Sequence, residues 1–281
     1  MGDCNSCTSK GKCNDKESCS KLFTKHGKVK NLIGVMSGKG GVGKSTVTGI
    51  LAIELRKAGF KVGVLDGDVT GPSMPRFFGV NNKRAEILQG ENSEEVKFAP
   101  IVTSSGIKLI SLNLLTEEEE QPVIWRGPVI TGVLTQMYSD TNWGELDYLL
   151  IDMPPGTGDI ALTVMQSLPV DGMVIVATPQ DMVTMIVKKN IIMAEKMNVK
   201  LVGVVENMCY IKCNNCMEHI KVFSKKSGSE QAKILGIPLL MELPIDLDLV
   251  ESMEEGNAES FILNSKEYEL LLENFKKNLN S

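Results

Sequence analysis

The sequence lacks any long hydrophobic run. Its apolar stretches are no longer than a β-strand, and Gly, Pro or charged residues interrupt them. Such stretches are too short for a membrane-spanning helix or for the apolar segment of a secretory signal. We therefore expect a cytoplasmic protein with no membrane partner.

An excess of positive charge is also missing. The chain carries 30 Lys and Arg against 35 Asp and Glu, a formal net charge of -5. A protein that neutralises nucleic-acid phosphates needs a basic face, and no basic run stands out along this chain. We expect no nucleic-acid partner.

Cysteine is absent from the long central part of the chain. The seven cysteines fall into two groups: Cys4, Cys7, Cys13 and Cys19, and then Cys209, Cys213 and Cys216. An odd total with C-x2-C spacing, in a chain expected in the cytosol, favours metal or cluster ligation over disulfides.

The remainder of the sequence predicts an α/β fold. With 42% hydrophobic and 23% charged residues, the 281-residue chain can bury a full core. Apolar strand candidates at 32–36, 62–65, 108–112, 148–151, 173–177 and 201–205 alternate with helix patterns near 44–58, 128–139, 159–167, 182–197 and 226–235. This alternation predicts a mostly parallel sheet flanked by helices, with ligands at the carboxyl ends of the strands.

The chain divides into two parts of unequal size. Residues 1–28 are polar and Cys-rich, so we expect a small metal- or cluster-binding appendage, followed by a single domain over residues 29–281. Residues 266–279 place apolar side chains at helical spacing, and we expect this helix to pack on the domain.

A phosphate-binding loop is the strongest motif. Gly38, Lys39, Gly40, Gly41, Val42, Gly43, Lys44, Ser45 and Thr46 satisfy the pattern G-x4-G-K-[ST], between an apolar strand and a helix. In such a loop backbone N–H groups surround phosphate oxygens, Lys44 reaches the β- and γ-phosphates, and the Ser45 hydroxyl ligates Mg²⁺. The motif predicts binding of a nucleoside triphosphate.

Three carboxylates are expected near these phosphates. Asp66 and Asp68 follow one strand, and Asp152 ends another. The position of Asp152 is typical of a Mg²⁺-directed carboxylate, and residues 153–159 are rich enough in Gly to form a switch that senses the γ-phosphate. No Asn-Lys-x-Asp guanine motif occurs in the sequence, which favours ATP over GTP.

The additional Lys39 resembles the deviant phosphate loop of dimeric ATPases such as MinD, ParA, the nitrogenase iron protein and the Mrp carriers. This resemblance implies a homodimer in which Lys39 crosses to the partner's ATP. It also implies that Asp68 orients the attacking water, that Asp66 supports the Mg²⁺ shell, and that Asn207 and Pro244 contact the adenine.

A second set of motifs indicates which group among these ATPases the chain resembles. Cys213-x2-Cys216 closely follows Glu206-Asn207-Met208, and residues 66–72, 125–128 and 152–159 match in the same order. Together they resemble the Mrp-type (ApbC-like) iron–sulfur cluster carrier ATPases over about residues 29–250. The family pattern needs no cysteine at Cys209, which is either a spare buried thiol or another ligand. Nearby His219 could bind a metal, but we expect it to be a polar loop residue.

The chemistry of the Cys213–Cys216 loop favours a shared site. A [4Fe–4S] cluster takes four thiolates, whereas one loop supplies two. A two-fold homodimer would supply four. Zinc is an alternative, because four thiolates in a tetrahedral array also satisfy Zn²⁺.

The N-terminal cysteines form a separate candidate site. Cys4, Cys7, Cys13 and Cys19 give four thiolates with the spacing C-x2-C-x5-C-x5-C. The first three resemble the N-terminal cluster motif of eukaryotic-type scaffold relatives, but the fourth lies downstream of them rather than upstream. A [4Fe–4S] cluster, a zinc knuckle and no permanent ligand all remain open here.

The resemblance implies an ATP-hydrolysing carrier that binds a [4Fe–4S] cluster and transfers it to apo iron–sulfur proteins. Two alternatives remain at this stage. One is a reductase similar to the nitrogenase iron protein, and the other is a MinD- or ParA-like organiser whose cysteines hold zinc.

Overall fold

The computed structural model describes residues 21–68, 71, 73–89, 96–116, 127–213, 215–224 and 227–281, without the side chains of 127–128 and 181–184. The predicted N-terminal site, Cys4, Cys7, Cys13 and Cys19, therefore lies outside the described residues, as do Trp125 and Arg126.

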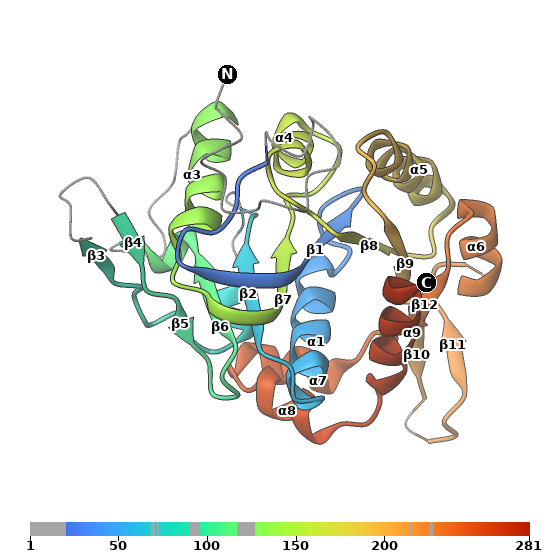
Figure 1. The fold of residues 1–281 in the computed structure, drawn as a ribbon. Helices are drawn as coiled ribbons and strands as arrows, with labels where there is room; N and C mark the ends of the chain where they lie inside the picture. The colour runs from blue at the N-terminus through green and yellow to red at the C-terminus, as the bar shows by residue number, and fades with distance from the viewer. Residues whose placement is uncertain are drawn as a thin grey trace.

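A twisted sheet organises the described part of the chain (Figure 1). Its strand order is β12-β9-β8-β1-β7-β2-β6-β5. The strands are β1 (Gly27–Ser37), β2 (Val62–Asp66), β5 (Ile101–Val102), β6 (Lys108–Ser111), β7 (Gly144–Asp152), β8 (Gly172–Ala177), β9 (Leu201–Glu206) and β12 (Leu239–Glu242). All neighbours pair in parallel except β5 and β6, which confirms the predicted α/β fold.

Helices cover both faces of this sheet. In Figure 1, α3 (Gly127–Asp140), α4 (Asp159–Ser167) and α5 (Asp181–Lys196) lie above it. Below it lie α1 (Lys44–Lys57), α7 (Leu247–Glu254), α8 (Ala258–Asn264) and α9 (Glu269–Asn280). The short α2 (Met74–Phe77) follows β2, the 3₁₀ turn η3 (Leu112–Leu114) follows β6, and α6 (Gly228–Leu235) precedes β12.

The core lies between these layers. Every residue of β2 and β8 is buried, as expected for parallel strands covered on both faces. Leu271 and Phe275 of α9 are fully buried, which confirms that the C-terminal helix packs on the domain. No helix in the described residues has the length and apolarity needed to cross a bilayer.

The sequence patterns missed the short elements. Two antiparallel hairpins, β3 (Ile87–Gln89) with β4 (Val96–Phe98) and β10 (Tyr210–Lys212) with β11 (His219–Lys221), were not predicted, nor were β5, β12, α2, α7 and α8.

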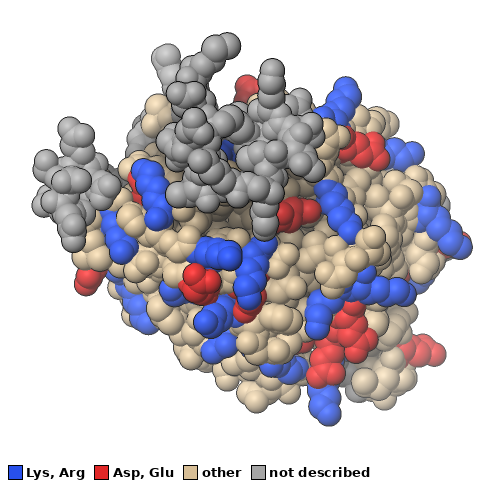
Figure 2. Space-filling model, viewed as in Figure 1, with Lys and Arg blue, Asp and Glu red and all other residues tan. Residues whose placement is uncertain are grey.

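On the face shown in Figure 2, Lys and Arg side chains are interspersed with Asp and Glu.

Candidate functional site

The phosphate loop connects the carboxyl end of β1 with the first turn of α1. Gly41 and Gly43 have φ angles of 77° and 80°, in the left-handed region that favours glycine. A Cβ on Gly43 would lie only 2.1 Å from the Asn207 Nδ2 atom, so a larger residue does not fit there. The unpaired N–H groups at the start of α1 then face the loop, as in other phosphate sites.

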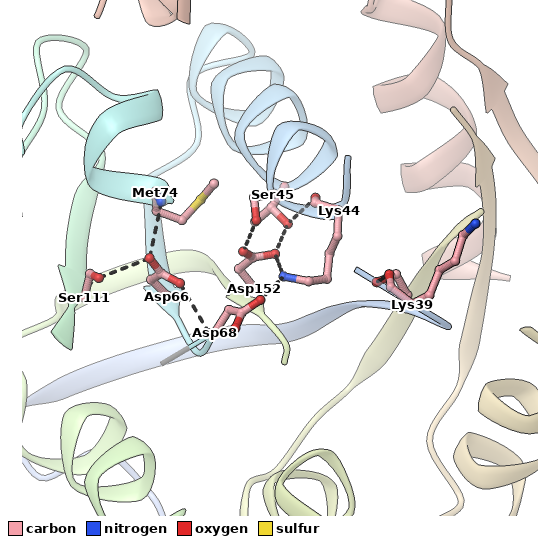
Figure 3. A network of polar contacts seen from close by, with 10 residues as sticks. Lys39, Lys44, Ser45, Asp66, Asp68, Met74, Ser111 and Asp152 are labelled. Atoms are coloured by element: carbon pink, nitrogen blue, oxygen red, sulfur yellow. Dashed lines mark hydrogen bonds and ion pairs between the residues drawn. The ribbon is translucent and has the colours of Figure 1, made fainter. Parts of the chain in front are cut away.

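Asp152 connects the loop to the sheet (Figure 3). Its Oδ1 atom lies 2.8 Å from Lys44 Nζ and accepts a hydrogen bond of 2.9 Å from the Thr48 hydroxyl. Its Oδ2 atom accepts a hydrogen bond of 2.5 Å from the Ser45 hydroxyl. Asp152 is fully buried, and a buried charge needs a partner of opposite sign. Lys44, which is itself only 6% exposed, is that partner. The structure thus brings together the predicted phosphate-binding lysine and two of the predicted Mg²⁺ ligands.

The two carboxylates after β2 have different surroundings. Asp66 is buried and accepts hydrogen bonds from Met74 N (3.2 Å), Ser111 Oγ (3.0 Å) and Asp68 N (3.3 Å). Burial, and then the charge of Asp152, raise the pKa of Asp66. Asp68 lies closer to solvent, with its Oδ2 atom 3.9 Å from Lys44 Nζ. Asp68 therefore faces the phosphate-binding lysine, while Asp66 fixes the connection from β2 to α2.

Lys39 lies on the rim of this site. Its Nζ atom points away from Lys44 and Asp152 (Figure 3) and donates a hydrogen bond of 2.9 Å to Gln180 Oε1, just before α5. The Ser37 hydroxyl donates to the Lys39 carbonyl at 2.9 Å, and Gly156 N of the predicted switch donates to the Ser37 carbonyl at 2.8 Å. In this arrangement Lys39 contacts its own chain.

A hollow of about 240 Å³ opens between these groups. It is lined by residues of the phosphate loop together with Ser37, Asp68, Gly71 and Pro155. Lys44, Ser45 and Asp68 all line it, so cationic, hydroxyl and carboxylate groups meet in one place. This is the combination of groups that phosphoryl transfer requires.

A smaller, mostly apolar cavity of about 120 Å³ adjoins α1. Thr46, Asn207 and Pro244 all line it, so the structure places the two predicted base-contacting residues together. The Asn207 side chain is buried and donates a hydrogen bond of 2.9 Å from Nδ2 to the Val42 carbonyl of the phosphate loop. Asn207 thereby links the end of β9 to the loop, a contact that the sequence patterns did not predict.

Cys213 and Cys216 occupy the tip of the β10–β11 hairpin. Cys213 N donates to the Glu218 carbonyl at 2.9 Å, and Met217 N donates to the Cys213 carbonyl at 2.8 Å, which closes the tip. Cys216 is exposed and Cys213 is partly exposed. Hydrogen bonds from the backbone of Cys216 and then of Asn215 lower the pKa of Cys213. A lowered pKa favours the thiolate, which is the form that ligates metals.

Cys209 has the opposite environment. It is buried, and its thiol donates a hydrogen bond of 3.1 Å to the Glu206 carbonyl. Burial, and then the charges of Glu206 and Glu242, raise the pKa of Cys209 to about 12. Of the two interpretations left open, the structure favours the spare buried thiol.

His219 also differs from expectation. It lies on β11 rather than in a loop, and its ring stacks on Tyr210 with ring centroids 3.9 Å apart and planes 14° from parallel. The prediction of a loop missed the hairpin because each of its strands is only three residues long.

Glu206 is a buried acid that the sequence analysis did not consider as a functional residue. Its side chain is 0% exposed, and neither carboxylate oxygen has a hydrogen-bond partner among the described residues. It lies beside Glu242 in the parallel register of β9 and β12. Burial, and then the charge of Glu242, raise the pKa of Glu206 to about 7. The only sequence signal was an acid at the end of an apolar strand.

Comparison with known proteins decides the family. The family model described as ParA, NUBPL iron-transfer P-loop NTPase, matches residues 28–280. The chain belongs to this family. The match includes the loop, the three carboxylates and the hairpin described above, and it confirms the resemblance to iron–sulfur cluster carrier P-loop NTPases.

This chain is similar to several known proteins over most of their length. The iron-sulfur cluster carrier protein of Clostridium perfringens is 60% identical, and the alignment covers 97% of this chain and 99% of that protein. The carrier protein of Methanocaldococcus jannaschii is 43% identical, covering 91% and 88%. A solved nucleotide-binding protein from Archaeoglobus fulgidus, in complex with ADP, has a TM-score of 0.72 and 42% identity, covering 83% of this chain and 89% of that chain.

Proposed function

We propose that this NTPase binds and hydrolyses ATP, holds a [4Fe–4S] cluster between two copies of itself, and transfers the cluster to apo iron–sulfur proteins. The observation that carries the proposal is the hairpin. It leaves the carboxyl end of β9, where Asn207 contacts the phosphate loop, and it presents Cys213 and Cys216 at an accessible tip.

The nucleotide chemistry is proposed as follows. On ATP binding, Lys44 exchanges its contact with Asp152 for the β- and γ-phosphates. The Ser45 hydroxyl and the Asp152 carboxylate are the groups that would hold Mg²⁺, since both are hard oxygen donors that already lie side by side. An ion held there would neutralise charge on the phosphate oxygens. Asp68, whose Oδ2 atom lies 3.9 Å from Lys44 Nζ, orients the attacking water.

Asp66 remains a proposed contributor to the Mg²⁺ shell. Its carboxylate already accepts three hydrogen bonds from Met74, Ser111 and Asp68. These contacts favour an indirect role, in which Asp66 positions Asp68 and α2 around the ion. Lys39 is proposed to leave Gln180 and reach the partner's nucleotide when two copies associate.

The cluster is cargo, and its ligand count favours a shared site. No group of three or more His, Cys, Asp or Glu able to hold a metal ion occurs in the residues that the structure describes. One hairpin tip contributes two thiols, so a second copy related by two-fold symmetry completes the four that a [4Fe–4S] cluster takes. A cluster bound in this way is released when the two copies separate, as a carrier requires.

Cys4, Cys7, Cys13 and Cys19 are proposed to bind a second cluster or a zinc ion, independently of the hairpin. We further propose that the acceptors are cytoplasmic apo-proteins and that neither a membrane nor a nucleic acid takes part.

Anaerobic reconstitution tests the proposal. The purified protein is incubated with iron and sulfide, and iron, sulfide and zinc per chain are measured beside the visible spectrum. The product is then mixed with the apo form of a [4Fe–4S] enzyme, whose recovered activity reports transfer. Replacing Cys213 and Cys216 with Ala should remove about half a cluster per chain, because one site serves two chains.

Cys209→Ala is the matched control, since it removes a nearby thiol that is buried. This variant should keep its iron content, because both hairpin cysteines are unchanged. Stoichiometric zinc without iron uptake in the wild-type protein would contradict the carrier proposal and favour an organiser ATPase.

A further inference from the structure

We propose that the connection between β9 and β10, residues Asn207, Met208 and Cys209, transmits the state of the nucleotide site to the cluster hairpin within a single chain. This inference rests on the proposed function and adds to it the segment that couples the two sites. The contacts at each end of the connection carry the argument.

The first end of the connection is held by the phosphate loop. Asn207 Nδ2 donates a hydrogen bond of 2.9 Å to the Val42 carbonyl, and Asn207 N donates one of 2.7 Å to the Ala177 carbonyl of β8. The Gly43 backbone also lies close to the Asn207 side chain, because a Cβ at that position would come within 2.1 Å of Asn207 Nδ2. A change in the loop on nucleotide binding therefore displaces Asn207 directly.

The second end is held by the hairpin and its neighbours. Cys209 N donates to the Leu243 carbonyl at 2.9 Å, and the Cys209 thiol donates to the Glu206 carbonyl at 3.1 Å. The Tyr210 carbonyl, at the start of β10, accepts from Ile245 N at 2.8 Å. Cys209 and the hairpin base are thus held together along residues 243–245.

Met208 joins these two ends in an unusual conformation. Its φ angle is 59°, in the narrow left-handed region that residues with a Cβ seldom adopt. A Cβ restricts the range of backbone angles available in this region, whereas glycine has a wide range. Met208 therefore makes the connection stiff, and a stiff connection passes a displacement of Asn207 on to the hairpin.

Met208→Gly tests the connection, because it widens the range of backbone angles at this position while leaving the contacts of Asn207 and Cys209 in place. Amide hydrogen exchange is measured by mass spectrometry on cluster-free protein, with and without Mg²⁺ and ADP. In the wild-type protein we expect ADP to slow exchange both in residues 38–46 and in residues 210–221, the latter by roughly 5-fold or more. In Met208→Gly the loop should still be protected, while the effect on residues 210–221 should fall below about 2-fold.

Two further variants separate backbone freedom from other effects. Met208→Ala removes most of the side chain but keeps the Cβ, so the hairpin should respond as in the wild type. Asn198→Gly changes another non-glycine residue with a positive φ, 53°, after α5, and should also leave the response unchanged.

The outcomes distinguish this inference from the proposed function. If ADP fails to protect residues 38–46 of the wild-type protein, the nucleotide site and the inference that depends on it are both wrong. If ADP protects the loop but not the hairpin, or if Met208→Gly keeps the full hairpin response, the proposed function stands and the coupling through Met208 is overturned.

Discussion

Glu206, the last residue of β9, is buried, and its carboxylate has no hydrogen-bond partner among the described residues. An ionised carboxylate without hydrogen-bond partners is costly to bury, and Glu242 in the next strand adds repulsion. The protein avoids most of this cost by keeping Glu206 protonated, which its raised pKa of about 7 allows. The acid lies directly before Asn207 and shares a strand end with the nucleotide site.

This makes the stability of the fold depend on pH. The folded protein holds the Glu206 proton up to about pH 7, whereas an unfolded glutamate loses it near its ordinary pKa of 4.5. Stability therefore falls as the pH rises from 4.5 to 7, and the loss is complete above that window. Glu206→Gln, which cannot ionise, should match the wild type at pH 4.5 and exceed it by roughly 2 to 3 kcal/mol at pH 8.

Thermal or urea unfolding of both proteins across this pH range measures the difference. Glu195→Gln, an exposed glutamate of α5, is the control and should show no such trend. A constant gap between Glu206→Gln and the wild type at all pH values would contradict the raised pKa.

Sequence patterns predicted part of the site well and part of it poorly. Lys44, Ser45 and Asp152 were expected together because a motif fixes the first two and the strand-end rule brings Asp152 to the same edge. The partner of Lys39 could not be predicted, since Gln180 is 141 residues away and the contact depends on two side-chain conformations. The same holds for the bond from Asn207 to Val42, which spans 165 residues.

At the scale of elements, the long strands and helices follow from their patterns, while the short ones do not. Strand β8 is a continuous run of buried, mostly apolar residues, and the 14-residue α1 directly follows the phosphate-loop motif, so both can be recognised in the sequence. The strands of the cluster hairpin have three residues each, too few for an alternation to be recognised. The C-x2-C motif therefore indicated a metal site but gave no information on the hairpin that presents it.

Packing between elements also depends on residues that no period reveals. Gly49 lies inside α1, and a Cβ there would come within 2.1 Å of the Phe77 ring. Phe77 belongs to α2, whose first residue, Met74, donates to Asp66. The glycine therefore lets α2 approach α1 closely enough to support the carboxylates after β2.

Gly49→Ala should accordingly be destabilising, although alanine is the better helix former. We expect a loss of about 1 to 3 kcal/mol in the free energy of unfolding, because the buried Phe77 ring must shift. Gly132→Ala, in α3, is a matched control with open space at the Cβ position, and it should gain up to about 1 kcal/mol. Urea titration measures both changes, and a stabilising Gly49→Ala would contradict the close packing of α2 on α1.

At the scale of the whole molecule, the phosphate site and the cluster hairpin both follow strands at the same edge of the sheet. Strands β1, β2 and β7 carry the phosphate site at their carboxyl ends, and β9 leads through Asn207 to the hairpin. Each site is proposed to need a second copy of the chain, one for Lys39 and the other for two more thiolates. A carrier built in this way links nucleotide state, dimerisation and cluster retention in one equilibrium.

Native mass spectrometry under anaerobic conditions tests this central claim most directly. The reconstituted protein is measured with Cys4, Cys7, Cys13 and Cys19 replaced by Ala, so that only the hairpin cysteines and Cys209 remain. The account predicts a dimer that carries one [4Fe–4S] cluster, and a monomer without iron once Cys213 and Cys216 are also replaced. A cluster retained on a single chain, or zinc in its place, would contradict a shared cluster between two hairpins.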